Sequence, residues 1–225
     1  MLVAKVYILR HGETNENRAH IIQGQLDTLL NEAGRKQAEM AVDLFRDVDL
    51  DFALTSDLQR AVETTEIILK DHPKRDSITL VKDKNLRERC FGKLEGLPIS
   101  AKRAQTGLDE TAENIQIFLN RALTWWDTQI VDGLTKAPGK KPHQVLVVSH
   151  GGFISALVKN LISSGRVKAE AEITNWICFN VSVTTIEVEE NSEARLVRYS
   201  DVQHLKVDEL VSYNADVVKA AEGLL

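Results

Sequence analysis

Two short apolar runs in this chain end abruptly in a histidine and a glycine. The first runs from Val6 to Leu9 and stops at Arg10-His11-Gly12. The second runs from Gln144 to Ser149, stops at His150-Gly151-Gly152, and leads into a helix from about Phe153. Continuous apolar runs of this length, rich in β-branched residues, are typical of buried strands. We therefore predict two buried strands with a histidine at one end of each, which core packing alone does not explain.

Helical spacing of apolar residues predicts the segments that follow the first strand. A loop over Arg18–Leu30 leads to Asn31, a typical helix N-cap. The apolar residues of the helix after it are Ala38, Ala41, Val42 and Phe45. A strand over 52–55 then ends at Ser56-Asp57, which is a second cap signal. The apolar face of the next helix consists of Leu58, Ala61, Val62, Thr65 and Leu69. Arg60 lies in the first turn of this helix, off that face.

The rest of the chain predicts further strands and one long helix. His72-Pro73 ends the preceding helix, and a third strand over Ile78–Val81 follows. The polar segment Leu97–Glu110 is expected to be a lid or a loop insertion. A long helix then carries on one face Ile115, Phe118, Leu119, Ala122 and Trp126. Trp125 and Trp126 are expected in the core or at its flank.

The segments after the long helix are a loop, further strands and a tail. Asp132–His143 is a loop rich in Gly, Pro and Lys. Val181–Val188 and Ala194–Tyr199 are expected to be strands, the first of them partly buried on both faces. The segment Asp208–Leu225 is acidic and partly amphipathic, and its pattern indicates no role.

The residues at the end of the first predicted strand have the chemistry of an anion site. His11 is a candidate nucleophile or general base, because imidazole titrates near neutrality. Arg10 offers a planar fork that matches a phosphate or a carboxylate. Gly12 allows a close backbone approach or a tight turn. In an open α/β sheet, ligands bind outside the carboxyl ends of the strands, where these residues would lie.

Other charged residues have two interpretations. Arg60 is either a solvated charge on a helix surface or a cation that reaches the same sheet edge as His11. Glu88 lies between Arg87 and Arg89, which is either a surface salt-bridge cluster of little energetic weight or a second part of the site. Cys90 is either an oxidation-sensitive thiol or an inert one.

Composition narrows the functional class. The chain has 225 residues, enough for one domain with a sizeable core. Its net charge of −5 argues against a general nucleic-acid binder, so a local cationic cluster would have to attract any anion. The two cysteines have no CxxC spacing, which argues against a disulfide framework or a zinc site and is typical of a reducing cytosol. No apolar run approaches the roughly 20 residues of a membrane span, and the N-terminus has no signal-peptide pattern, so we expect a cytoplasmic protein without membrane contact.

These motifs, in this order, resemble those of the histidine phosphatase, or phosphoglycerate mutase-like, superfamily. The resemblance covers nearly the whole chain. The motifs that carry it are Leu9-Arg10-His11-Gly12-Glu13-Thr14, Asn17, Gln23-Gly24, Leu30–Ala38, Thr55–Ala61, Leu86–Gly92 and Val148–Gly152. It implies an α/β fold, a three-layer α/β/α sandwich with a mostly parallel central sheet. It also implies one domain over 1–225 with a short lid insertion at about 97–110.

The resemblance implies a role for each matching residue. His11 would attack phosphorus and become a phosphohistidine, while Arg10, Arg60 and His150 surround the transferring phosphoryl group. Glu88 would protonate the leaving oxygen and then activate water. The residues implied to bind phosphate or substrate are Asn17, Gln23, Gly24, Arg89 and Gly151. No cofactor and no metal are implied. The nearest members are small fructose-2,6-bisphosphatase-like and broad-range sugar-phosphate phosphatases.

Departures from the mutases favour hydrolysis. The mutases of this superfamily carry a longer, basic segment where this chain has Leu97–Glu110, and a tyrosine where it has Phe91. A shorter lid would leave a phosphohistidine open to water. Lys93, Lys102 and Arg103 either contact a second phosphate or are solvated.

We therefore expect a metal-independent phosphomonoester hydrolase acting on small phosphorylated metabolites, such as sugar phosphates or bisphosphates. The alternatives are a phosphoglycerate mutase and a non-catalytic phosphate-binding scaffold. The expected partner is a small phosphorylated substrate, not nucleic acid or a membrane, and the protein would be a monomer or a homodimer.

Overall fold

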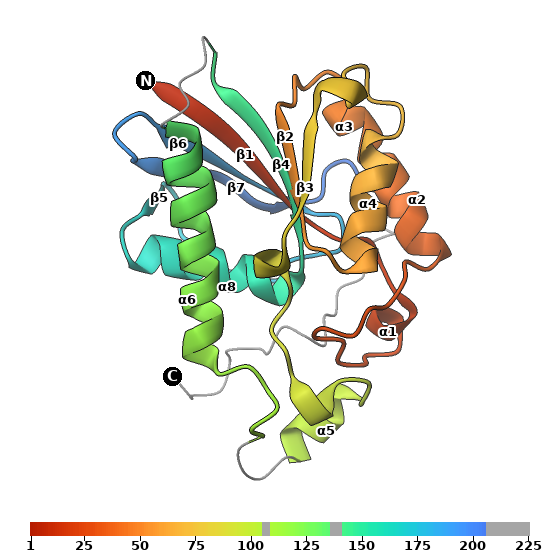
Figure 1. Cartoon of the computed structure of the whole chain (residues 1–225). Coiled ribbons are helices and arrows are strands. Elements are labelled where there is room, and N and C mark those ends of the chain that lie inside the picture. Colours follow the sequence, from red (N-terminus) through yellow and green to blue (C-terminus); the bar gives the residue numbers. More distant parts are fainter. Residues whose placement is uncertain (105–108, 136–140, 206–225) are drawn as a thin grey trace.

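A central seven-stranded sheet organises the chain (Figure 1). The computed structural model describes residues 1–104, 109–135 and 141–205; the side chains of 102–104 and 135 are not described. The strands are β1 (Leu2–Arg10), β2 (Phe52–Thr55), β3 (Thr79–Lys82), β4 (His143–Ser149), β5 (Val167–Ala169), β6 (Val183–Glu189) and β7 (Ala194–Asp201). Their order across the sheet is β3-β2-β4-β1-β6-β7-β5. Among these strands β6 alone runs antiparallel to its neighbours, so the predicted mostly parallel sheet is confirmed.

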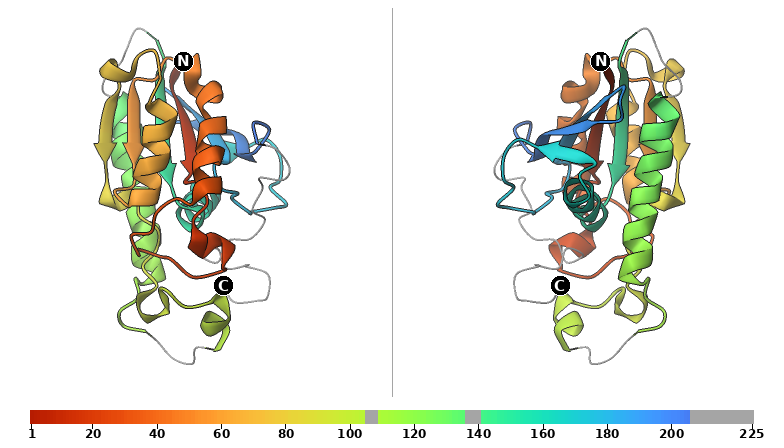
Figure 2. Two further views of the ribbon diagram at one scale, coloured as in Figure 1. Left: turned by 90° about the vertical axis from the view of Figure 1, so that its right-hand side faces the viewer. Right: turned by 90° about the vertical axis from the view of Figure 1, so that its left-hand side faces the viewer.

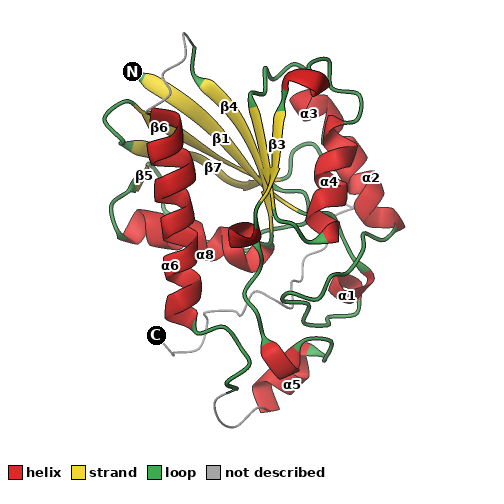
Figure 3. Cartoon of the chain, in the orientation of Figure 1, coloured by secondary structure: helices red, strands yellow, loops and turns green. Residues whose placement is uncertain are grey.

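Helices cover both faces of the sheet, which confirms the three layers (Figure 3). The α-helices are α1 (Asn15–Arg18), α2 (Glu32–Met40), α3 (Val42–Arg46), α4 (Gln59–Leu69), α5 (Ile99–Ala104), α6 (Ile115–Trp125), α7 (Gly133–Thr135) and α8 (Gly151–Ser163). A π-helical stretch, Trp126–Asp132, continues α6. The two side views of Figure 2 show α2 and α4 in front in one and α6 and α8 in front in the other.

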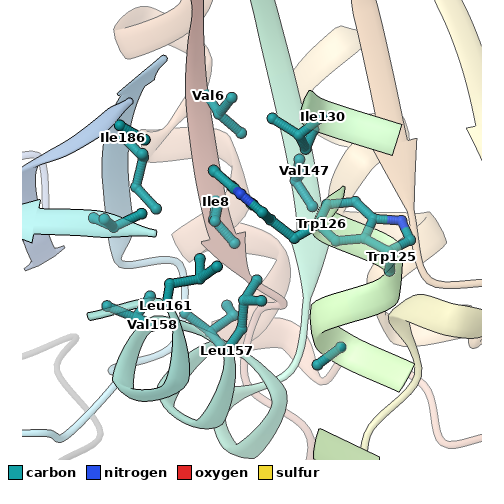
Figure 4. Packing of buried hydrophobic residues seen from close by; sticks show 14 of the residues in the cluster. Val6, Ile8, Trp125, Trp126, Ile130, Val147, Leu157, Val158, Leu161 and Ile186 are labelled. Carbon is teal, nitrogen blue, oxygen red and sulfur yellow. The ribbon is translucent and has the colours of Figure 1, made fainter. Parts of the chain in front are cut away.

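Alternation along β1 divides the core into two parts. Successive side chains of a strand point to opposite faces. Val6 and Ile8 accordingly pack with α6 and α8, while Tyr7 and Leu9 pack with α3 and α4. Figure 4 shows the first part, where Trp126 and Leu157 approach Ile8 from two different helices. A strand with both faces buried reads as a continuous apolar run, which is the pattern seen in the sequence.

Pairing places three strand ends at one edge of the sheet. Arg10 at the end of β1 pairs with Ser149 at the end of β4, and Thr55 at the end of β2 pairs with Val148. The residues that follow these ends, among them His11 and His150, are therefore neighbours.

Several predicted boundaries differ from the observed ones. The helix expected after Asn31 is divided into α2 and α3, although Asn31 caps it as predicted, its side chain accepting from Gly34 N at 2.8 Å. The third strand begins at Thr79 and the helix after His150 begins at Gly151, while β5 was not predicted. Ile115 was expected on a buried face but is 44% exposed, because α6 projects beyond the sheet where it begins.

The expected cap at Ser56-Asp57 is wrong. The helix α4 begins at Gln59, and its N-cap position has no side-chain cap of its own. Asp27 instead accepts a hydrogen bond from the backbone N–H of Gln59 at 2.7 Å. The first turn of α4 is therefore capped by a side chain from a loop that is distant in sequence. Asp57 is engaged by both nitrogens of the Arg87 fork, at 2.6 and 2.7 Å.

Parts of three predicted segments lie outside the described residues: 105–108 of the lid, 136–140 of the loop before β4, and the tail 208–225. Within the described residues, no helix has the length and apolar character needed to cross a membrane.

Candidate active site

Two histidines stand side by side at the carboxyl edge of the sheet. The ring centroids of His11 and His150 are 5.1 Å apart, and each residue is only 1% exposed. His11 follows β1 and its backbone N–H donates to Ser149 O at 3.0 Å, which ties it to the end of β4. The two apolar runs thus bring together two residues that are 139 positions apart, counted from their numbers 11 and 150.

The hydrogen bonds of His11 define its tautomer. Nδ1 lies 2.7 Å from the carbonyl oxygen of Gly12, and a carbonyl oxygen only accepts, so Nδ1 carries the proton. Nε2 therefore has a lone pair, toward which Arg60 Nε–H points at 3.3 Å. Burial, followed by the charges of Arg60 and Arg10, holds the pKa of His11 well below its usual value. His11 is accordingly a neutral imidazole with an available Nε2.

Arg60 is fully buried, so its interpretation as a solvated surface charge is wrong. Besides facing His11, its guanidinium donates to Leu26 O at 2.6 Å and to Gly24 O at 2.8 Å. These bonds tie the loop before α2 to the carboxyl edge of the sheet. Gly24 itself has a φ of +51°, a conformation that glycine adopts without strain.

Arg10 and His150 complete the buried cluster. Arg10 is 1% exposed, and its Nη1 donates to Cys178 O at 2.8 Å. His150 Nε2 lies 2.9 Å from Ser56 Oγ, while its buried Nδ1 has no hydrogen-bond partner among the described residues. Burial, then the charge of Arg60, holds the pKa of His150 well below its usual value.

Glu88 is buried at the start of α8 rather than exposed in a surface cluster. It is 1% exposed; Oε1 accepts from Arg89 N at 2.9 Å and Oε2 accepts from Gly152 N at 2.7 Å. A Cβ at Gly152 would lie 2.6 Å from Glu88 Oε1, so any other residue there would displace the Glu88 carboxylate. The Glu88 carboxylate is therefore fixed two residues beyond His150, on the backbone of the first turn of α8.

The remaining predicted site residues differ in what they contact. Asn17 and Gln23 are fully buried and are linked through Thr14, whose hydroxyl donates to Gln23 Oε1 at 2.9 Å. They support the loop that carries Gly24. Gly151 is the first residue of α8. Arg89 contacts residues outside the histidine cluster: its Nε donates to Glu113 O at 2.9 Å and its guanidinium lies 5.5 Å from the Phe91 ring centroid.

The sequence reasoning missed two residues that hold the site. Arg121 donates to Arg87 O at 2.9 Å and to Glu88 O at 3.3 Å, and it forms a two-pronged ion pair with Glu113. Asn180 donates to His11 O at 2.9 Å. One feature of the sequence could have indicated Arg121: it lies three residues after Phe118, beside the apolar face of the predicted helix. Asn180 had none.

The structure gives a reason for a glycine at position 12 that concerns helix packing rather than a ligand. A Cβ there would collide with the backbone of Gly34, and a Cβ at Gly34 would collide with the backbone of Glu13. The two glycines let the first turn of α2 pack directly against the loop that carries His11.

This arrangement is suited to an anion that presents electrophilic phosphorus. Two buried guanidinium groups, Arg10 and Arg60, face two neutral histidines, which gives a local positive site in a chain of net charge −5. The phosphoryl oxygens need such fixed donors. Among the described residues no cluster of three or more His, Cys, Asp or Glu side chains has the arrangement of a metal site.

Comparison with known proteins gives related sequences and structures. The model of the histidine phosphatase superfamily (branch 1) matches residues 6–202. A probable phosphatase of Schizosaccharomyces pombe is 33% identical over 213 residues, covering 91% of this chain and 97% of that protein. A broad-specificity phosphatase of Saccharomyces cerevisiae is 28% identical over 218 residues, covering 93% and 90%. The solved structure of YhfR from Bacillus stearothermophilus superposes with a TM-score of 0.73 at 26% identity, covering 89% of this chain and 98% of that one.

Proposed function

The chain belongs to the histidine phosphatase superfamily, branch 1, and from this premise we propose that it hydrolyses phosphate monoesters of small metabolites through a phosphohistidine at His11. The two fungal relatives are named as phosphatases, which supports hydrolysis as the reaction class. One of them is named for broad specificity, and we extend that property to this chain as part of the proposal.

One observation carries the proposal: His11 presents an unprotonated Nε2 beside Arg60, held by the bond from Nδ1 to Gly12 O. A nucleophile must have a free lone pair, and the lowered pKa of His11 maintains one near neutrality. The guanidinium group would shift to a phosphoryl oxygen when substrate binds. The nucleophile and its charge stabiliser therefore already share one buried site.

The proposed reaction has two balanced steps. In the first, Nε2 of His11 attacks phosphorus, the bond from phosphorus to the ester oxygen breaks, and protonated Glu88 gives its proton to that oxygen. In the second, Glu88 takes a proton from water, the water oxygen attacks phosphorus, and the phosphorus–nitrogen bond breaks. Arg10, Arg60 and His150 would stabilise the charge of the transferring group in both steps.

Hydrolysis is favoured over phosphoryl return to a substrate because the segment proposed as a lid is short. Within 97–110 the described helix is α5 (Ile99–Ala104), which lies beyond the carboxyl edge of the sheet (Figure 1). We propose that this segment covers the site only in part, as an insertion in a single domain over 1–225, and lets water reach the phosphoenzyme. The alternative function is that of a phosphoglycerate mutase, which would use the same site residues.

The test is phosphate release, with a chelator present, from nitrophenyl phosphate, sugar phosphates and bisphosphates, and phosphoglycerates. Wild-type protein should release phosphate, and His11→Ala should lower the rate by at least about a thousandfold, since a missing nucleophile is not replaced by its neighbours. His143→Gln is the matched control, because His143 begins β4 at the opposite end of the strand from the site. Activity retained in His11→Ala would contradict the proposal, and isomerisation of phosphoglycerate without net phosphate release would favour the mutase.

A further inference from the structure

A pocket of about 240 Å³ opens beside Glu88, between the start of α6 and the segment 152–160 of α8. Figure 1 shows these two helices crossing near the carboxyl edge of the sheet. One wall is apolar and consists of Phe91, Ile115, Phe118 and Leu119, and Ala156 faces it from α8. Drug-sized ligands occupy pockets of roughly 300 Å³ or more, so this one is suited to a small metabolite fragment.

The charged residues that line this pocket are Glu88, Arg89 and Lys159. Arg89 donates to Glu113 O, and Glu88 accepts from two backbone N–H groups. Lys159 is different: its Nζ lies 5.0 Å from the centroid of the Trp176 ring, and within the described residues no carboxylate lies within ion-pair distance of it. Burial lowers the pKa of Lys159 from its usual value.

The position of Glu88 relates the pocket to the proposed reaction. An acid must lie within hydrogen-bond reach of the oxygen that it protonates, so the leaving group departs on the Glu88 side of the phosphoryl group. The pocket begins at Glu88 and at Gly152, whose N–H holds the Glu88 carboxylate. A leaving group that extends beyond its ester oxygen would therefore enter the pocket.

From this geometry we propose that the pocket is the leaving-group subsite, and that it selects phosphate monoesters whose leaving group has an apolar body and an anionic end that pairs with Lys159. This inference rests on the proposed phosphatase function and narrows its substrate class. The uncharged polar residues that line the pocket are Ser155 and Asn160, and both already donate to backbone carbonyl groups of α8, of Gly151 and Ala156. The rest of the uncharged lining is apolar apart from backbone, so a neutral polyol would leave hydroxyl groups buried without partners, which is costly. Lys159 has no carboxylate partner in the part of the chain that the structure describes and lies beside an aromatic ring, so its ammonium group favours a carboxylate or a second phosphate.

The test uses two leaving groups of nearly the same shape: para-carboxyphenyl phosphate and its neutral analogue para-carbamoylphenyl phosphate. Wild-type protein should have a kcat/KM about three- to tenfold higher for the carboxylate, mainly through KM, since a half-exposed ion pair is partly screened. Lys159→Met should reduce this preference to about one, by lowering kcat/KM for the carboxylate. Lys159→Arg should retain the preference. Lys168→Met is the matched control, because Lys168 pairs with Glu193 on the surface.

A second variant tests the pocket by volume. Ala156→Leu should fill part of it and raise KM for both aryl substrates, with little effect on ethyl phosphate, whose leaving group is too short to enter. Circular dichroism of each variant checks that the fold is intact.

The outcomes separate the two proposals. Suppose that both aryl substrates are hydrolysed in a His11-dependent manner. If wild type then has no preference for the carboxylate, or if Lys159→Met keeps that preference, the proposed subsite is overturned and the phosphatase function stands. If the carbamoyl substrate and all other phosphate monoesters are left intact by folded protein, the phosphatase function fails and the subsite falls with it.

Discussion

Arg60 Nε lies 3.3 Å from His11 Nε2, and both side chains are shielded from solvent. A guanidinium keeps its proton at any ordinary pH, so it opposes a second proton on His11. Burial is the main cause of the lowered pKa of His150, and the positive charge of Arg60 lowers it further. The same pair of residues would therefore supply the unprotonated nucleophile of the proposed reaction, and it couples the stability of the fold to pH.

We predict that this coupling destabilises the protein below neutral pH. His11 and His150 stay neutral in the folded chain, whereas in the unfolded chain they take up protons below their usual pKa of 6.5. The unfolded state thus binds more protons as pH falls, and the folded state loses stability, by up to about 1.4 kcal/mol per histidine at a pH one unit below that value. Above it, neither histidine contributes to the pH dependence.

Urea unfolding at pH 7.5 and pH 5.5 measures this effect for wild type and for His11→Gln. Over this interval the variant should lose about 1 kcal/mol less of its free energy of unfolding than wild type. Parallel losses in the two proteins would mean that His11 is protonated in the folded state.

Glu88→Gln should be destabilising although the side chains have the same shape. Both carboxylate oxygens of Glu88 accept from backbone N–H groups, of Arg89 and Gly152, and an amide nitrogen cannot accept. One N–H would face another donor, at a cost of about 1–3 kcal/mol. If Glu88 is the acid, turnover should also fall more for alkyl phosphates than for nitrophenyl phosphate, whose leaving group needs no proton. Glu63→Gln, which removes a partly exposed ion pair with Arg35, is the comparison for thermal unfolding and rates.

Arg121 should act on the reaction through Glu88. It donates to the backbone carbonyl groups of Arg87 and Glu88, so Arg121→Gln would loosen the loop that positions Glu88, the proposed acid. We expect about a tenfold lower kcat for alkyl phosphates, because a carboxyl group displaced by a fraction of an ångström transfers its proton less well. The kcat for nitrophenyl phosphate should change little, and Arg121→Lys should restore part of the loss. Arg166→Gln removes a comparable ion pair, with Asp127, away from the site and should leave both rates unchanged. Equal losses for the two substrates would indicate general damage to the site.

Gly34→Ala should destabilise the protein, contrary to helix propensity. Alanine is favoured over glycine in a helix by about 1 kcal/mol, but a Cβ at Gly34 would collide with the backbone of Glu13. Relieving that collision moves the loop that carries His11, so we expect a loss of about 1–3 kcal/mol in unfolding free energy and a lower kcat. Gly133→Ala is the control, since the nearest atom to its Cβ would be 3.3 Å away. Stabilisation by Gly34→Ala, measured in urea, would show that the loop yields freely.

The sequence determined the elements and the identity of the candidate site. Continuous apolar runs located β1 and β4, and the residues after them, His11 and His150, were identified because buried strands rarely end in histidine for packing reasons. Asn31 was predicted as a cap because capping is local: its side chain bonds an N–H three residues away.

Only the tertiary structure decided what surrounds these residues. Spacing along a helix shows on which face Arg60 lies, but not that a loop from another part of the chain closes over it and buries it. Asp27, and not a residue at Ser56-Asp57, caps α4. Arg121 donates to the carbonyl group of Glu88, 33 residues away, and Asn180 donates to that of His11, 169 residues away. Hydrogen bonds between segments so distant in sequence depend on how the sheet and its loops meet in space, and no local pattern of residues records that.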